Sequence, residues 1–471
     1  MSRRFSRRSL LATLGLGSLA GCLRGELSTG STLTDTPTAT TTERTTTATT
    51  ATATPVPPVT ERYDLSVAHE SGTSETSWEP PSSPPPTGLS VEPVVENLAI
   101  PWEVTFAPNG DLFVSERPGR ILRYSAGTLE ASFEANDVVD ASAVAHGDEG
   151  GWWAAGGEGG LMGLAVHPRY PDVPVVYAVY TSDTDDGPRN RLVAFDVTAD
   201  DPAKTETVLI DGIPGARVHN GSRLAFGPSN YLWMTTGDAA AEENAADPTN
   251  LAGSVLRLEP DGTAPADNPD FGPEADPRLY TIGHRNPQGL TWLPDGTTLI
   301  TEHGPGGADE INRLVAGANY GWGTMDPTKR GAGGYTDSSF ARPVVNTGSK
   351  TWAPPGCTFY TGSLDGFRNR LVVGGLRSQR LNVVTLVPAG ESLPGTASGT
   401  TYNAPWMDDQ YDAVAHARLE NELGRIRDVT QAPDGSLLVS TSNRDGRTRS
   451  DSVEYPRPND DRILRVVPAS E

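Results

Sequence analysis

The sequence predicts an all-β fold, a six-bladed β-propeller with four-stranded antiparallel blades, preceded by a disordered N-terminal tether. Three observations predict this fold. From about Val91 onward, short apolar or alternating runs are separated by turns rich in Gly, Pro and Asp. No long run with helical periodicity competes with them. A turn motif also recurs along the chain at spacings that suit propeller blades.

The predicted strands are short and have the apolar or alternating pattern of strands that pack in a sheet. The clearest are residues 111–117, 120–124, 175–181, 191–197, 231–238, 254–262, 298–301, 371–376, 380–387, 436–442 and 462–468. They are distributed over the whole of 91–468, which we therefore predict to be the propeller domain.

Four turns that introduce these strands share a Pro followed by a polar residue and then Gly or Asn. Proline presets the first turn dihedral, and Gly or Asn accepts the positive one. The prolines, Pro108, Pro228, Pro294 and Pro433, are 120, 66 and 139 residues apart, close to one or two multiples of a unit of about 60–70 residues. About six such units fit in 91–468. Sandwich domains in tandem are the alternative, but they do not explain why polar clusters fall at similar places relative to the turns.

The first 22 residues have the features of an export signal. A twin-arginine pattern (6–11) overlaps an apolar run (10–20) that is too short to span a bilayer. The run ends in Leu-Ala-Gly-Cys (19–22), which is similar to a lipobox, so we expect cleavage before Cys22 and lipid attachment to its thiol. The alternative is an ordinary secretory signal with a chance cysteine. The expected location is extracytoplasmic, anchored by lipid at the cell surface.

Residues 23–90 form the predicted linker. Residues 28–60 are rich in Thr with almost nothing apolar, and residues 61–90 stay polar and end in runs of proline. Such a segment cannot bury enough apolar surface to offset the entropy lost on ordering. We therefore expect a disordered tether over 23–90 that holds the domain away from a membrane.

Acidic residues dominate the charge of the chain. Asp and Glu number 60 against 37 Lys and Arg, which gives a formal net charge of -23. A surface with this charge repels nucleic acid and anionic lipid. It resembles the surfaces of proteins from high-salt organisms, where salt screens self-repulsion, so a halophilic origin is a hypothesis. Because Cys22 belongs to the signal, Cys357 is expected to be a free, buried thiol.

The densest group of polar residues lies between Tyr280 and Trp322. It contains three clusters, at 284–288, 302–305 and 309–310, around a predicted strand. Further polar or glycine-rich clusters lie at 157–168, 219–228, 238 and 424–429. In a propeller the ends of the inner strands and the loops after them converge near the central channel. Residues that are distant in sequence can therefore share one site.

The same stretch carries a resemblance to a known family. GHRNPQGL (283–290), EHGPGGADEIN (302–312) and GANYGW (317–322), in this order, are similar to the soluble quinoprotein glucose/sorbosone dehydrogenases, which include the aldose sugar dehydrogenases that use pyrroloquinoline quinone (PQQ). Five clusters match the family in order. The resemblance implies a propeller enzyme that oxidises the anomeric hydroxyl of an aldose to a lactone, with PQQ and Ca²⁺ as cofactors and an unknown electron acceptor.

The resemblance also assigns catalytic roles. His219 aligns with the general base of the family, and a histidine can take a hydroxyl proton because it titrates near neutrality. Asp238 corresponds to the carboxylate that partners this base. Arg285 is expected to polarise the oxyanion that develops on the quinone, with Asn286 alongside it. Glu158 corresponds to a Gln or Glu that touches the quinone. Taken without the resemblance, Glu158 and Asp238 could equally be turn carboxylates.

Because PQQ bears three carboxylates, the resemblance implies a cationic pocket. Arg425 and Arg427 alternate on one predicted strand and so point to the same face, where two guanidinium groups match a polycarboxylate. A surface ladder of Arg and Asp is the alternative. Arg377 falls where glucose dehydrogenases have Lys, a departure that leaves its contact open. Gly356 ends a segment, 353–356, that resembles a backbone segment near the quinone.

The resemblance implies two sites for Ca²⁺, a cation that binds oxygen ligands including backbone carbonyls. The family holds its catalytic Ca²⁺ through the carbonyls of a Gly-Pro pair, here Gly304 and Pro305. Glu310 and the Tyr320 carbonyl resemble a further Ca²⁺ site of the aldose dehydrogenase branch.

Two other functional classes remain open. One is a Ca²⁺-dependent propeller hydrolase that acts on lactones, which would need the carboxylates and Ca²⁺ but not Arg425 and Arg427. The other is a non-catalytic surface propeller that keeps the fold as a binding module. The presence of His219 together with Arg285 argues against the second.

Overall fold

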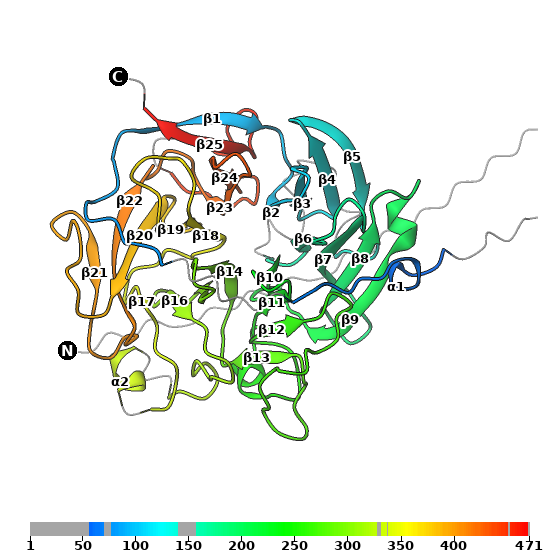
Figure 1. Ribbon diagram of the computed structural model, residues 1–471, viewed down its shortest axis with the longest axis horizontal. Coiled ribbons are helices and arrows are strands. Elements are labelled where there is room, and N and C mark those ends of the chain that lie inside the picture. Colours follow the sequence, from blue (N-terminus) through cyan, green and yellow to red (C-terminus); the bar gives the residue numbers. More distant parts are fainter. Residues whose placement is uncertain are drawn as a thin grey trace, which may run out of the picture. The chain divides into compact units, whose positions relative to one another are not determined.

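The computed structural model describes residues 56–69, 77–139, 157–326, 331–336, 338–450 and 453–469, all within one compact unit that begins at Pro55. The expected export signal, Cys22 and residues 23–55 lie outside the described residues. Six antiparallel sheets form a ring (Figure 1), so the prediction of an all-β, six-bladed propeller is confirmed. No helix in the described ranges is long and apolar enough to cross a membrane.

Each blade follows the chain outward from its innermost strand. Blade one comprises β2 (Pro101–Phe106), β3 (Leu112–Glu116), β4 (Arg120–Ser125) and β5 (Thr128–Glu134). Blade two comprises β6 (Leu161–Val166), β7 (Val175–Ser182), β8 (Arg189–Asp196) and β9 (Thr207–Pro214). Blade three comprises β10 (Gly221–Phe226), β11 (Leu232–Thr236), β12 (Ser254–Leu258) and β13 (Leu279–Ile282).

The remaining blades vary this plan. Blade four comprises β14 (Pro287–Trp292), β15 (Thr298–Glu302), β16 (Glu310–Arg313) and β17 (Val345–Asn346). Blade five has a fifth strand and comprises β18 (Cys357–Tyr360), β19 (Arg370–Val373), β20 (Leu381–Pro388), β22 (Tyr411–Arg418) and β21 (Thr400–Tyr402). Blade six comprises β23 (Ile426–Gln431), β24 (Leu437–Thr441), β25 (Ile463–Pro468) and β1 (Leu89–Val95). Short helical turns, α1 (Val59–Arg62), α2 (Ala332–Tyr335), η1 (Pro202–Thr205) and η2 (Glu242–Ala246), lie between strands or before them.

The innermost strands form a closed ring. β2 packs against β6, β6 against β10, β10 against β14, β14 against β18, β18 against β23, and β23 against β2. Blade six takes its outermost strand from the N-terminal side of the domain, because β1 pairs with β25 and Leu89 lies opposite Pro468. This pairing joins the two ends of the domain and closes the ring. The expected domain start at residue 91 falls inside β1.

The four turns predicted from the repeated motif all connect the innermost strand of a blade to its second strand. Gly110, Asn230, Gly296 and Gly435 each donate a backbone hydrogen bond of 2.8–2.9 Å to the carbonyl three residues earlier, and their φ angles are 62° to 91°. Gly and Asn adopt this left-handed conformation most easily. The turns lie at the opposite end of the innermost strands from residues 219, 285 and 425.

Five of the innermost strands contain a register irregularity close to their first residue. The irregularities lie between Pro101 and Glu103, Leu161 and Leu164, Gly221 and Leu224, Pro287 and Gly289, and Ile426 and Asp428. A bulge bends a strand and redirects its side chains. Arg427 lies inside one of these bulges, and Arg425 precedes β23. The predicted regular alternation of these two residues along one strand is therefore wrong in detail, because a bulge breaks the period.

Apolar side chains fill the spaces between neighbouring blades. β7 is buried at all eight positions, as expected for a strand covered on both faces. The largest cluster joins blades two and three and includes Tyr177 and Met234. Cys357 is a free, buried cysteine, as predicted, and burial raises the pKa of its thiol to about 12.

A group of charged residues, which we term the axial contact, links the innermost strands at the centre of the ring. Arg223 Nη1 of β10 donates to Glu103 Oε1 of β2 at 2.7 Å and lies 3.0 Å from Asp428 Oδ1 of β23. Arg223 Nε donates to the Gln288 carbonyl of β14 at 2.8 Å. The three charged side chains are 4–7% exposed. Buried ionisable groups need such partners because removing charge from water is costly.

Two segments of the expected linker are ordered against the propeller. In residues 56–69, Val59 and Leu65 are buried in the cluster between blades two and three, at 0% and 5% exposure. In residues 77–90, Trp78 packs against Phe359 of blade five with 5.0 Å between ring centres. The prediction of disorder up to residue 90 is therefore wrong for both segments. A few separated apolar residues dock them, a pattern that mean composition does not detect.

Candidate active site

His219 lies just before β10, at the end of the ring where the innermost strands begin. Its Nδ1 is 2.8 Å from Asp238 Oδ1, and its Nε2 is 2.8 Å from Arg285 Nη2. An ionised Asp only accepts hydrogen bonds and Arg only donates them. The imidazole therefore carries its proton on Nδ1 and presents a lone pair at Nε2. The fold brings the expected base, its carboxylate partner and the expected polarising arginine into contact.

Neighbouring residues hold the His219 backbone in an unusual conformation. Its φ is 61°, in the left-handed region that residues with a Cβ avoid. The His219 carbonyl accepts a hydrogen bond from the Ala239 amide, and the His219 amide donates to Glu158 Oε2, both at 3.1 Å. Gly237 allows this approach, since a Cβ there would lie 2.0 Å from the His219 carbonyl oxygen. Contacts from two blades thus set the direction of the imidazole.

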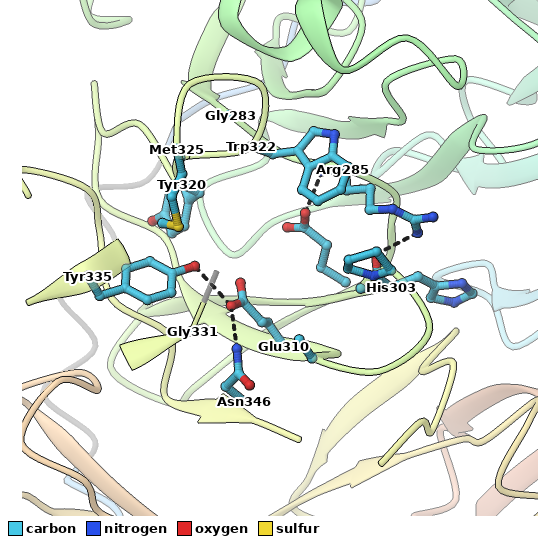
Figure 2. Close-up of a pocket in the computed structure, with 15 residues that line it drawn as sticks. Gly283, Arg285, His303, Glu310, Tyr320, Trp322, Met325, Gly331, Tyr335 and Asn346 are labelled. Atoms are coloured by element: carbon cyan, nitrogen blue, oxygen red, sulfur yellow. Dashed lines mark hydrogen bonds between the residues drawn. The ribbon is translucent and has the colours of Figure 1, made fainter. Parts of the chain in front are cut away.

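Asp238 has a further side-chain partner that the sequence analysis missed. Trp322 Nε1 donates to Asp238 Oδ2 at 2.7 Å. The Trp322 ring also lies 5.3 Å from the Arg285 guanidinium (Figure 2). Trp322 ends the GANYGW motif, so its position was conspicuous, but nothing in the sequence indicated which residues it would contact. It supports both Asp238 and Arg285.

Arg285 and Asn286 reach the site from the entrance to blade four. Arg285 Nη1 donates to the His303 carbonyl at 3.0 Å, and burial lowers the pKa of Arg285. Asn286 is fully buried, and its Oδ1 accepts the Gly221 amide at 3.0 Å. Within the described residues, Asn286 Nδ2, Arg285 Nε and His303 Nε2 are buried polar atoms without a hydrogen-bond partner. Unpartnered buried atoms are rare, and a group of them suits a polar ligand.

An arginine-lined cavity of about 410 Å³ lies beside these residues. Five arginines and one carboxylate face it, and in a chain of net charge -23 this concentration of positive charge suits a small polyanion. The lining residues are Glu158, Gln288, His303, Ala353, Leu376, Arg377, Arg425, Arg427, Gly446, Arg447 and Arg449. Burial lowers the pKa of His303 to about 3, so this imidazole is neutral.

Arg425 and Arg427 are both buried in the wall of this cavity. Arg425 Nε donates to Asp445 Oδ2 at 2.9 Å, so the Arg–Asp pairing weighed as an alternative exists here inside the cavity wall. Arg427 Nη1 donates to the neutral Gln288 side chain at 2.9 Å, and Arg427 Nε has no partner among the described residues. Burial lowers the pKa of Arg427 to about 9. Arg427 is therefore the more available of the two for an anion.

Arg377 lines the cavity from the turn after β19, but Gly356 does not lie among the lining residues. A Cβ at Gly356 would lie 1.8 Å from Asp428 Oδ1, so this glycine packs against the axial contact. Ala353 is the member of the 353–356 segment that faces the cavity. Ala353 joins the candidate site, and the expected role of Gly356 near the ligand stays a prediction.

Glu158 lies on the glycine-rich loop that leads into β6. Arg117 holds this loop by donating from Nε to the Gly159 carbonyl at 3.0 Å and from Nη2 to the Gly157 carbonyl at 2.9 Å. Arg447 Nη1 is paired with Glu158 Oε1 at 3.1 Å. Burial alone would raise the pKa of Glu158, but Arg447 and neighbouring groups lower it to about 2. Glu158 is thus ionised, and its partner Arg447 was missed because it lies on an irregular loop.

A second cavity, of about 40 Å³, shares the lining residue His303 with the first, and Figure 2 draws the residues around it. Gly304, Pro305, Glu310 and Tyr320, which the sequence analysis assigned to two separate Ca²⁺ sites, all line this one cavity. His303 lines both cavities and separates them. The volume is enough for an ion or one water molecule.

Glu310 is the carboxylate at the centre of the second cavity. Its Oε1 accepts hydrogen bonds from Tyr335 at 2.9 Å and from Asn346 at 2.8 Å (Figure 2). Burial and the nearby Glu302 raise the pKa of Glu310 to about 7. Among the described residues, no group of three or more His, Cys, Asp and Glu side chains is arranged as a metal site. Two carboxylates, Glu302 and Glu310, line the cavity, so a cation here would depend on them and on backbone carbonyls.

The molecule is thus a six-bladed propeller with a His–Asp pair beside an arginine-lined cavity, whose charge suits a small anion. Residues 98–450 match the profile of the family Glucose / Sorbosone dehydrogenase, and the chain belongs to this family. The resemblance noted in the sequence is thereby confirmed.

Relatives with sugar dehydrogenase names cover most of the chain. It is 32% identical to the PQQ-bound form of an aldose sugar dehydrogenase from Streptomyces coelicolor, with a TM-score of 0.59, over 81% of this chain and 99% of that one. It is 26% identical to quinoprotein glucose dehydrogenase B of Acinetobacter calcoaceticus over 76% of this chain and 86% of the relative. It is 28% identical to an aldose sugar dehydrogenase of Escherichia coli over 77% and 92%.

Proposed function

We propose that the protein oxidises aldose sugars to lactones, with PQQ as hydride acceptor and Ca²⁺ as an activating ion. The observation that carries the proposal is the contact of His219 with Asp238 and Arg285 beside a cavity lined by five arginines. Membership of the family and the likeness to a PQQ-bound sugar dehydrogenase support it.

The donors of the cavity fit a planar tricarboxylate. Arg377, Arg425 and Arg427 would hold carboxylates through charge-assisted hydrogen bonds. The unpartnered Asn286 Nδ2 and Arg285 Nε would donate to carbonyl oxygens at the His219 side of the ligand. When bound, PQQ supplies an ortho-quinone that accepts a hydride, a chemistry that no protein side chain provides.

His219 is the proposed general base. Nε2 accepts the proton of the anomeric hydroxyl as hydride leaves the carbon, and Asp238 holds the proton on Nδ1 and stabilises the imidazolium that forms. A single lone pair accepts one hydrogen bond well, so the sugar hydroxyl takes the place of Arg285 at Nε2. Arg285 then directs its charge toward the negative charge that develops during the reaction.

The second cavity is the proposed Ca²⁺ site. The carbonyls of Gly304, Pro305 and Tyr320 and the carboxylate of Glu310 would supply hard oxygen ligands. A cation held there would lie next to the arginine-lined cavity, across His303, and would contribute Lewis-acid polarisation. Glu302 also lines the cavity, but the Arg285 amide and His284 already engage its two oxygens. With Glu310 as the one available charged ligand we expect modest affinity, because Ca²⁺ affinity rises with the number of charged ligands.

Sugar oxidation outside the cytoplasm is part of the proposal. The twin-arginine pattern and the Leu-Ala-Gly-Cys sequence support export and lipid attachment at Cys22, and the electrons would pass to an acceptor that is not identified. Mass spectrometry of the mature protein should show cleavage before Cys22 and a lipid mass on it. An unmodified Cys22 would remove the anchor.

Reconstitution tests the enzyme activity. The purified protein is incubated with PQQ and Ca²⁺, quinone binding is followed by absorbance, and sugar oxidation is followed with a redox dye. We expect binding and oxidation, with H219Q retaining the first and losing the second. Absence of both in the wild-type protein would contradict the proposal.

A further inference from the structure

We propose that Arg447 is a positioning residue that fixes the general base His219 through Glu158. The inference rests on the proposed function for the role of His219 as base, but the contacts that carry it belong to the protein alone. Nothing in the motifs that match the family assigns a role to Arg447.

Arg447 connects two distant parts of the ring. It lies on the loop after β24 of blade six, where its amide donates to Asp445 Oδ1 at 3.0 Å. Its side chain reaches the entrance to blade two, donating to Glu158 Oε1 at 3.1 Å and to the Gly157 carbonyl at 2.7 Å. Asp445 also accepts from Arg425, so one buried carboxylate orients both arginines. Hydrogen bonds therefore hold both the backbone amide of Arg447 and its guanidinium group.

Glu158 transmits this restraint to His219. While Oε1 faces Arg447, Oε2 accepts the His219 amide at 3.1 Å. This hydrogen bond holds a residue whose φ of 61° is unfavourable for a side chain with a Cβ. If the carboxylate rotates, the amide loses its acceptor, and if the carboxylate takes up a proton, the hydrogen bond weakens because a neutral carboxyl is a poorer acceptor. Either change loosens the restraint on the imidazole. The chain of contacts thus runs from Arg447 to Glu158 to the base.

The charge of Arg447 is as important as its hydrogen bonds. Glu158 shares the cavity wall with arginines that would be neutralised by a bound polyanion, and a nearby anion favours protonation of a carboxylate. Arg447 counters this effect at Glu158 itself, consistent with the lowered pKa of that carboxyl. Glu158 therefore stays ionised, and remains a full acceptor for the His219 amide, when the anionic ligand is bound.

Substitution of Arg447 should act on the carboxylate without unfolding the loop. Arg117 holds the carbonyls of Gly157 and Gly159 independently of Arg447. A matched control is available in Arg380, which pairs with Glu420 at 2.7 Å and is 23% exposed, compared with 25% for Arg447. R380Q removes an ion pair of the same type on blade five, outside the residues that line the two cavities.

The experiment compares R447Q, R447K and R380Q, first without cofactor. Carbon NMR titration of the Glu158 carboxyl should show a pKa at least about one unit higher in R447Q than in the wild type. The His219 imidazole signals of R447Q should also shift. R380Q should match the wild type in the Glu158 pKa and in the His219 signals. With saturating PQQ, kcat should fall about tenfold in R447Q, because displacing the general base by a fraction of an ångström slows the reaction. R447K, which keeps the positive charge, should retain most of the wild-type kcat.

The two hypotheses fail in different ways. If R447Q leaves the Glu158 titration and the His219 signals at their wild-type values in the cofactor-free protein, the positioning role is overturned whatever the activity. If the Glu158 titration and the His219 signals both change, Arg447 positions His219. If the wild-type protein in that case neither binds PQQ nor oxidises sugars, only the proposed function is refuted.

Discussion

Trp322 Nε1 donates a 2.7 Å hydrogen bond to the oxygen of Asp238 that does not face His219. The two carboxylate oxygens are thus held on opposite sides, by an indole and by an imidazole. A buried carboxylate fixed at both oxygens cannot rotate away from the histidine. The orientation of the proposed base therefore depends, through Asp238, on a residue of blade four.

Replacing Trp322 by Phe tests this dependence. W322F keeps an aromatic ring near Arg285 but removes the donor to Asp238, and loss of a hydrogen bond to a buried charged group costs about 1–3 kcal/mol. We expect kcat to fall about tenfold if this cost is felt in the transition state. W292F is the control, since Trp292 packs on Trp233 at the far end of β14. Equal kcat values for the two variants would contradict the role.

The charge of Asp238 is tested by D238N. An Asn can donate its amide to Nδ1 of His219, which would move the imidazole proton to Nε2 and abolish the base. We expect kcat to fall by about 10² to 10⁴, with PQQ affinity changed by less than about threefold. Steady-state kinetics and a quinone absorbance titration check the two values. A loss confined to PQQ affinity would show that Asp238 belongs to the binding pocket.

Arg427 should contribute more to ligand binding than its surface counterparts do. Removing a charge-assisted hydrogen bond costs about 1.5–3 kcal/mol, so R427Q should weaken PQQ binding by about 10 to 150-fold. R465Q, which removes an arginine that is 42% exposed on β25, should leave it unchanged. Fluorescence or absorbance titration measures the affinities. Undiminished catalysis in the R425Q/R427Q double variant would instead favour the Ca²⁺-dependent lactone hydrolase.

The axial contact should make stability depend on pH. Burial raises the pKa of Glu103 to about 8 from an ordinary value of 4.5, even though Arg223 acts in the opposite direction. The folded protein then retains a proton that the unfolded chain releases, so this group stabilises the fold fully below about pH 4.5 and the stability is lost as pH rises toward 8. Urea unfolding at pH 5 and pH 8 measures the difference. E103Q should show a smaller decline, and an equal decline would refute the assignment.

The ordered segment before the propeller should contribute to stability. Leu65 is 5% exposed and Val56 is 44% exposed. Truncating a buried Leu to Ala costs about 2–5 kcal/mol, whereas an exposed position contributes little. L65A should therefore lower the free energy of unfolding by this amount and V56A should not. If residues 56–69 were a disordered linker, both variants would unfold like the wild type.

The fold was predictable because its strongest determinants are local. Turns such as those ending in Gly110 and Gly296 need a residue that tolerates a positive φ, and they recur once per blade in four blades. The docking of Val59 and Leu65 was not predictable in this way. Each is a single apolar residue in a polar segment, and the propeller residues of its cluster begin at Ala165, a hundred residues after Leu65.

The candidate site was predictable only where a motif carried it. His219, Asp238 and Arg285 stand in clusters that resemble the family, and the fold brings them within hydrogen-bonding distance. Arg447 stands in an irregular loop without a motif, and only the closure of the ring places it beside Glu158. Within the 353–356 segment, the sequence did not indicate that Ala353 would be the residue lining the cavity.

The pairing of β1 with β25 has a consequence for how the protein is made. The first and last strands of the domain must meet, so blade six cannot acquire its outer strand until β25 has been synthesised and has left the ribosome. Removal of β25 would accordingly leave β1 without its partner and blade six without its two outer strands, which makes β25 a checkpoint for maturation of the domain.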